Sequence, residues 1–165
     1  MDAPINKILA CVDFSPYSLL TMEYALEFAG EEQAQIIVLN VINQHDVRGI
    51  EMAAGFFPGY FAGGMDAREY IKQVRKDRTQ KLKQMIKEHF FEDKSRMSIQ
   101  IDTGIPYDCI LKAIKTEEID LVVMANKGRS NIGNFLVGSC AEKVFRHSPV
   151  PVVSVRDPGK FHKGS

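Results

Sequence analysis

The chain lacks the sequence features that mark several classes of protein. None of its apolar runs approaches the roughly 20 residues needed to cross a bilayer, and residues 1–4 lack the basic and apolar regions of a signal peptide. Its 21 basic and 21 acidic side chains cancel, so no excess charge points to nucleic acid or a membrane as the main partner. A length of 165 residues with 45% apolar composition favours one globular domain.

Cysteine is scarce and poorly placed for cross-links or metal. The three cysteines, Cys11, Cys109 and Cys140, are an odd number and form no C-x-x-C pair, and the four histidines show no metal-ligand spacing. We therefore expect neither a disulfide framework nor a zinc site, and a reducing cytoplasm fits the composition.

Familiar catalytic motifs are also missing. The sequence contains no G-x4-G-K-[S/T] loop and no G-x-S-x-G elbow, and no Ser/His/Asp arrangement can be placed. These absences exclude a classical P-loop hydrolase, and no catalytic residue is assigned.

Strand-like and helix-like segments alternate along the chain. Such alternation predicts a parallel sheet with helices on both faces, a Rossmann-like α/β fold. Apolar runs predict strands at residues 8–12, 36–42, 97–101, 121–125 and 150–155. Helical signals predict helices from Ser15 and Pro16 to Gly30, from Asp66 to about Phe91, from Pro106, and from Gly138 to about His147.

The apolar patterns also predict the strand order. The first, second and fourth strands are continuously apolar, as expected for strands covered on both faces. The third alternates and the fifth contains Pro151, so both look like edge strands. The order 3-2-1-4-5 follows, and it places a switch point between strands one and four. We expect the ligand site there, built from residues 12–15 and the loop after Ala125.

Residues 43–65 form the longest stretch without a clear pattern. The segment is rich in glycine and carries Phe56, Phe57, Tyr60 and Phe61. It is predicted to be an irregular loop, and two readings stay open. The loop either tucks its aromatic rings onto the core or forms a lid or contact surface.

The segment after the fourth strand predicts an anion site. It leaves a buried strand and enters a helix whose first-turn amides and positive dipole end suit a phosphate. Residues that allow close approach or add a donor or a positive charge are Lys127, Gly128, Arg129, Gly138, Ser139 and Cys140. Two simpler readings remain: Ser139 with Glu142 fits a capping box, and Asp13 at the end of the first strand could cap the next helix.

The segment after the fourth strand resembles the nucleotide motif of the universal stress protein family. The family's nucleotide motif, G-x2-G-x9-G-[S/T], reads here as Ala125-x2-Gly128-x9-Gly138-Ser139. Residues 12–15, 104–106 and 148–153 also resemble family signatures. The likeness covers residues 5–155 of the single domain and leaves residues 157–165 as a tail.

The resemblance implies a stress-response protein that binds ATP, or AMP or ADP, and forms a homodimer through the fifth strand. We interpret the protein as a dimeric regulatory switch with at most slow ATP hydrolysis, in which Asp13 could reach a magnesium ion. The implied nucleotide-binding residues are Cys11, Asp13, Val41, Met124, Ala125, Gly128, Arg129, Gly138, Ser139 and Cys140.

Ala125 departs from the family pattern, which has glycine at this position. An alanine forced to a positive φ would cost about 1–2 kcal/mol, and its methyl group could block a ligand. The alternative function is therefore a nucleotide-free dimeric interaction or scaffold protein that uses the aromatic residues of 56–61.

Overall fold

Five parallel strands form a single sheet in the order β3-β2-β1-β4-β5, which confirms the predicted order. The structure is a computed structural model and describes residues 4–30, 34–56, 67–126 and 138–156. The strands are β1 (Lys7–Cys11), β2 (Gln35–Asn43), β3 (Met97–Gly104), β4 (Leu121–Ala125) and β5 (Val152–Val155).

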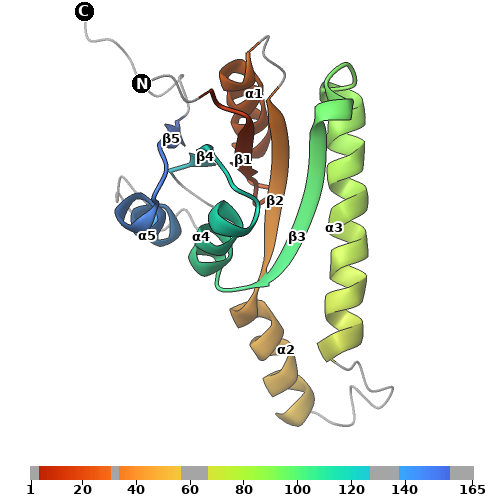
Figure 1. Ribbon diagram of the computed structural model, residues 1–165. Helices are drawn as coiled ribbons and strands as arrows, with labels where there is room; N and C mark the ends of the chain where they lie inside the picture. Colours follow the sequence, from red (N-terminus) through yellow and green to blue (C-terminus); the bar gives the residue numbers. More distant parts are fainter. Residues whose placement is uncertain (1–3, 31–33, 57–66, 127–137, 157–165) are drawn as a thin grey trace, which may run out of the picture.

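Helices cover both faces of the sheet, which confirms the predicted α/β fold class. Figure 1 shows α1 and α3 on one side of the sheet and α4 and α5 on the other, while α2 projects beyond the end of β2. No helix in the described ranges has the length and apolar character to cross a membrane. The helices are α1 (Ser18–Ala29), α2 (Gln44–Phe56), α3 (Ala67–His89), α4 (Pro106–Thr116) and α5 (Ser139–His147), with a 3-10 turn, η1 (Lys94–Arg96), before β3.

The side chains of β1 divide the core into two layers. Ile8 and Ala10 pack against α1 and α3, whereas Leu9 packs against α4 and α5, and all three are fully buried. Successive side chains of a strand point to opposite faces. A strand covered on both faces therefore needs an apolar residue at every position, which explains the continuous apolar run.

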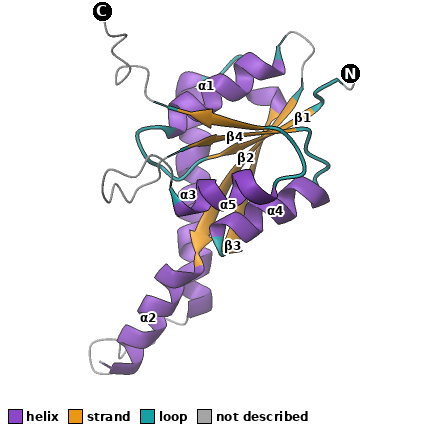
Figure 2. Ribbon diagram, turned by 90° about the vertical axis from the view of Figure 1, so that its left-hand side faces the viewer, coloured by secondary structure: helices purple, strands orange, loops and turns teal. Residues whose placement is uncertain are grey.

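Residues 44–56 correct the prediction of an irregular loop, because they form helix α2. Gly49 and Gly55 suggested a loop, since each glycine weakens a helix by about 1 kcal/mol. Contact with α3 and burial of Val47 in the core, where it is 6% exposed, outweigh that cost. Figure 2 shows α2 extending away from the sheet. Phe56 ends the helix, whereas Phe57, Tyr60 and Phe61 lie outside the described residues.

The start of α1 also differs from the prediction. The helix begins at Ser18 with Tyr17 as its N-cap, and Ser15 does not cap it. Instead, Ser15 makes a turn: its hydroxyl accepts a bond from the Tyr17 amide at 3.3 Å, and its carbonyl accepts one from the Ser18 amide at 3.0 Å. Pro16 therefore lies in this turn and outside the helix.

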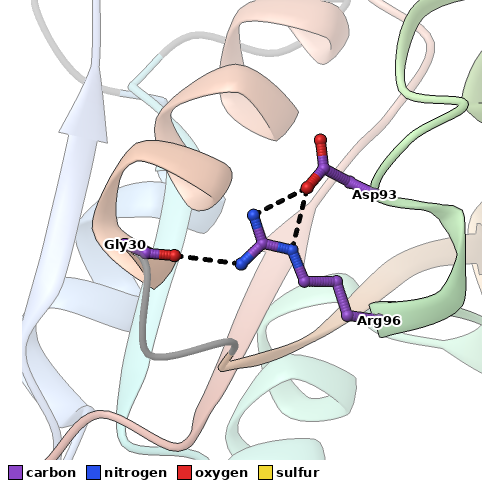
Figure 3. Close-up of polar contacts among 3 residues, drawn as sticks. All are labelled: Gly30, Asp93 and Arg96. Carbon is purple, nitrogen blue, oxygen red and sulfur yellow. Dashed lines mark hydrogen bonds and ion pairs between the residues drawn. The ribbon is translucent and has the colours of Figure 1, made fainter.

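An arginine ties the entry of β3 to the end of α1. Nε and Nη2 of Arg96 donate to the same carboxylate oxygen of Asp93 at 3.0 and 2.7 Å, and Nη1 donates to the carbonyl of Gly30 at 3.2 Å (Figure 3). The planar guanidinium suits several donors in fixed directions. Through it, the 3-10 turn before an edge strand is held against the neighbouring helix.

Leu82 of α3 should carry a large share of the packing on its face of the sheet, since it is fully buried. We expect Leu82→Ala to lower the free energy of unfolding by about 2–5 kcal/mol, because it removes buried methyl groups and leaves a cavity. Urea denaturation measures the change. Lys83→Ala, at the exposed neighbouring position, should change it by less than about 0.5 kcal/mol. Equal effects of the two substitutions would contradict the packing described here.

Candidate functional site

The candidate site lies where the chain leaves β1 and β4 toward opposite faces of the sheet. After β1 the chain turns to α1 on one face, and the helix that follows β4, α5, packs on the other. Such a reversal between neighbouring parallel strands leaves their carboxyl ends open, and ligands of open α/β sheets bind there. Asp13 follows β1 and Asn126 follows β4 at this edge.

Main-chain bonds join the two ends of the predicted phosphate loop. The amide of Gly138 donates to the carbonyl of Asn126 at 2.7 Å, and the amide of Asn126 donates to the carbonyl of Val155 at 3.2 Å. The start of α5 is thereby fixed next to the end of β4. Gly128 and Arg129, between these anchors, lie outside the described residues, and their contacts with phosphate remain predictions.

Helix α5 begins with main-chain donors that have no acceptor among the residues that the structure describes. Its N-cap is Gly138, which has no side chain to accept a bond, and Ser139 is its exposed first residue. The predicted capping box is therefore wrong, and the Glu142 carboxylate accepts a bond from Arg146 at 2.9 Å instead. In the described part of the chain, the amides of residues 139–141 have no acceptor. Three N–H groups at the positive end of a helix suit an anion.

Asp13 is held by a tight turn at the end of β1. One carboxylate oxygen accepts a bond from the Ser15 amide at 3.0 Å. Because α1 begins only at Ser18, the predicted alternative that Asp13 caps this helix is wrong. Phe14 adopts a φ of 61°, a left-handed conformation that costs about 1–2 kcal/mol. The Nζ atom of Lys81 lies 4.5 Å from the Phe14 ring centroid, and this contact helps to hold the strained turn.

Cysteines line the same edge of the sheet. Cys11 and Cys140 pack against the apolar layer that Val41 and Met124 also join. Burial, helped by the nearby charge of Asp13, raises the pKa of the Cys140 thiol to about 11. Burial likewise raises the pKa of Cys11 and of Cys109. Desolvation therefore outweighs the dipole of α5, and these thiols stay protonated at neutral pH.

Ala125 occupies ordinary strand backbone. Among the described residues other than glycine, only Phe14 and Glu118 have a positive φ, so alanine carries no backbone strain at this position. Strand alternation places its methyl on the side of Leu121 and Val123, which pack with α1 and α3. The methyl is thus directed away from the face that holds Cys11, Val41 and Cys140.

Two residues near this edge were missed in the sequence. Asn40 is 2% exposed, and its Nδ2 donates to the carbonyl of Val12 at 2.8 Å. Nη1 of Arg78, from α3, donates to Oδ1 of Asn40 at 2.8 Å and to the carbonyl of Val41 at 2.9 Å. Two signals could have revealed them: a lone polar residue inside an apolar run, and an arginine on the inner stripe of a helix.

The described residues of this edge offer few ligands for a metal ion. Within the ranges that the structure describes, no group of three or more His, Cys, Asp or Glu side chains could hold a metal ion. Magnesium at this site would therefore need ligands from a bound phosphate, as is usual for this ion.

The fold and this edge define an open α/β domain with a candidate ligand site at the switch point between β1 and β4. The chain belongs to the universal stress protein family, whose sequence pattern matches residues 4–156. The resemblance read from the motifs is thereby confirmed at the level of the family.

Relatives support this assignment along the whole chain. The universal stress protein MJ0577 of Methanocaldococcus jannaschii is 24% identical, over 94% of this chain and 98% of its own. Its solved structure superposes with a TM-score of 0.75 at 25% identity and covers 93% and 96% of the two chains. A universal stress protein solved in complex with cAMP superposes with a TM-score of 0.56 at 20% identity, over 93% and 98% of the two chains.

The buried thiols predict slow reaction with a disulfide reagent. At pH 8 a pKa of about 11 for Cys140, against the ordinary 9.0, leaves about a hundredfold less thiolate. We expect the native protein to react slowly with dithionitrobenzoate, and the rate for Cys140 to keep rising above pH 9. In guanidinium, all three thiols should react at the rate of free cysteine. Cys140→Ser identifies the contribution of this residue, and a native Cys140 that reacts as fast as free cysteine would contradict the burial.

Proposed function

We propose that the protein binds an adenine nucleotide, ATP or its smaller relatives ADP and AMP, at the carboxyl ends of β1, β2 and β4. The observation that carries the proposal is the set of amides at residues 139–141, which have no acceptor among the described residues and are fixed beside the end of β4 by the bond from Gly138 to Asn126. These donors fit an anionic ligand. The cAMP complex of a structural relative supports an adenine nucleotide as that ligand.

Each part of the nucleotide meets a different part of this edge in the proposal. The phosphates lie at α5 against the amides of Ser139 and Cys140, joined by Gly128 and Arg129 from the intervening segment. The base and ribose lie between the ends of β1 and β2, near Cys11, Asp13 and the main chain of Val41, with Met124 and Ala125 beside them. The Asp13 carboxylate accepts bonds from ribose hydroxyls or reaches a magnesium ion carried by the phosphates.

We propose a regulatory role in the stress response, with at most slow ATP hydrolysis and no assigned catalytic residue. A cytoplasmic location is part of the proposal, because the three cysteines are free and suit a reducing compartment. In this role the bound nucleotide would act as a signal, sensed by the dimer surface or by a protein partner.

The proposed dimer forms through β5. In the described sheet this strand pairs with β4 alone. Its odd-numbered residues face β4, because the carbonyls of Pro151 and Val155 accept bonds from Val122 and Asn126. The amides of Val152 and Ser154 therefore point to the outer edge, where a second copy could pair with them.

One observation favours the second candidate function, a nucleotide-free interaction protein. On α2, which projects from the body of the domain, Met52 is 62% exposed and Phe56 is 75% exposed. Large apolar side chains on a projecting helix suit contact with another protein.

Nucleotide binding should stabilise the fold. Mg-ATP at a hundredfold excess over its Kd should add about 2.7 kcal/mol to the free energy of unfolding, which raises Tm by about 5–11 °C. Differential scanning fluorimetry measures the shift. Absence of a shift with ATP, ADP and AMP would rule out the proposal.

Ser139→Glu separates binding from stability. An acidic residue in the first turn of α5 should hold or slightly raise stability through the helix dipole, but it should abolish the shift caused by ATP through repulsion of the phosphates. Gln80→Glu adds the same charge at an exposed position of α3, on the other side of the sheet, and should keep the full shift. A shift that survives Ser139→Glu would place the phosphates elsewhere.

The two association surfaces can be told apart by substitution. Ser154→Pro removes an amide from the outer edge of β5 and spares the bonds to β4, so the dimer should dissociate. The double variant Met52→Ser and Phe56→Ser should stay dimeric. Sedimentation velocity measures both. The reverse result would favour the interaction protein that uses α2.

A further inference from the structure

The hydrogen-bond ladder between β1 and β2 stops in an unusual way. The paired residues end at Cys11 and Leu39, and one more bond follows, from the Val12 amide to the Leu39 carbonyl at 2.9 Å. In a parallel ladder the next bond would run from the Val41 amide to the Val12 carbonyl. That carbonyl accepts from Nδ2 of Asn40 instead, at 2.8 Å. Val41 therefore faces the open edge with its amide outside the ladder.

Arg78 fixes this arrangement from the α3 side of the sheet. The two hydrogens of its Nη1 reach Oδ1 of Asn40 at 2.8 Å and the Val41 carbonyl at 2.9 Å. Because Oδ1 of Asn40 accepts from a cation, its NH2 group must turn toward Val12. Asn40 is nearly fully buried, so bonds to the charged group are strong. The guanidinium of Arg78 thus fixes the Asn40 side chain, which bonds to Val12 in place of the ladder, and it also fixes the carbonyl of Val41.

We propose that Asn40 and Arg78 are positioning residues that present the main chain of Val41 to the base of the bound nucleotide. The inference rests on the proposed function, which already places Val41 at the base, and adds the two side chains that hold this main chain in position. The edge of adenine carries a ring nitrogen that accepts a hydrogen bond next to an amino group that donates one. The amide of Val41 can donate to the first, and its carbonyl can accept from the second. Because both are held before the ligand arrives, little order has to be gained on binding.

Arg78 acts through Val41 and does not contact the phosphates in this account. Its guanidinium lies on the face covered by α1 and α3, whereas the free amides of α5 lie on the face covered by α4 and α5. Substitution of Arg78 should therefore weaken recognition of the base and leave the phosphate end unchanged.

A matched pair of variants tests the inference. Arg78→Gln removes the charge and shortens the reach to Val41. Arg75→Gln is the control, since Arg75, one turn earlier on α3, donates to the Ile101 carbonyl of β3 and to Thr103, and these contacts lie away from Val41. Isothermal titration gives the Kd for ATP, and an NMR spectrum of the 15N-labelled protein follows the Val41 amide.

We expect Arg78→Gln to weaken ATP binding about tenfold or more, equivalent to about 1.4 kcal/mol, and Arg75→Gln to change the Kd less than twofold. ATP should shift the Val41 amide signal in the unsubstituted protein, and the shift should shrink in Arg78→Gln. Should Arg78→Gln fail to fold, Asn40→Asp keeps the acceptor for Arg78, removes the donor to Val12 and should weaken binding similarly.

Three results would overturn the inference: unchanged ATP affinity in a folded Arg78→Gln protein, equal losses in both arginine variants, or a Val41 amide that ignores ATP while the protein binds it. Failure of the unsubstituted protein to bind any adenine nucleotide is a different outcome. It would remove the proposed function itself and with it the ligand that Val41 is proposed to meet.

Discussion

Strand β1 is enclosed on four sides, and the rest of the structure is arranged around it. It bonds to β2 on one edge and to β4 on the other, while helices cover both of its faces. Ile8, Leu9 and Ala10 are fully buried as a result. The chain leaves this strand at its carboxyl end, where it turns through Phe14 at a positive φ. The candidate site forms around this turn.

The two faces of the sheet supply different parts of that site. The face of α4 and α5 offers the amides at residues 139–141 together with Cys11 and Cys140. The opposite face supplies Arg78, whose bonds reach Asn40 and the Val41 carbonyl. In our proposal the first face holds phosphate and the second orders the main chain that reads the base. Such a division lets the two contacts be altered independently.

Much of the fold was readable from the sequence because strand burial leaves a direct pattern. Continuous apolar runs marked β1, β2 and β4 as central, so the strand order was predictable. Pro151, the predicted edge signal, lies just before β5 and faces β4. Helix α2 was not, because Gly49 and Gly55 argue locally against a helix that contact with α3 stabilises. Local propensity is a weak guide where tertiary contact decides the outcome.

The site was predictable only in part. The glycine and serine spacing after β4 indicated an anion-binding helix start, but it also suggested a capping box, which the position of Gly138 as N-cap excludes. Whether alanine at position 125 strains the backbone depends on the φ of this residue, which cannot be read from the sequence. Asn40 and Arg78 lie 38 positions apart along the chain, and only the packing of α3 on β2 brings them together.

The most direct test of the account is a crystal structure of the protein grown with ATP and magnesium. The account predicts density for the nucleotide across the ends of β1 and β4, with phosphate oxygens at the amides of Ser139 and Cys140 and the base against the main chain of Val41. An edge without nucleotide at saturating ATP, or a nucleotide bound away from α5, would contradict it.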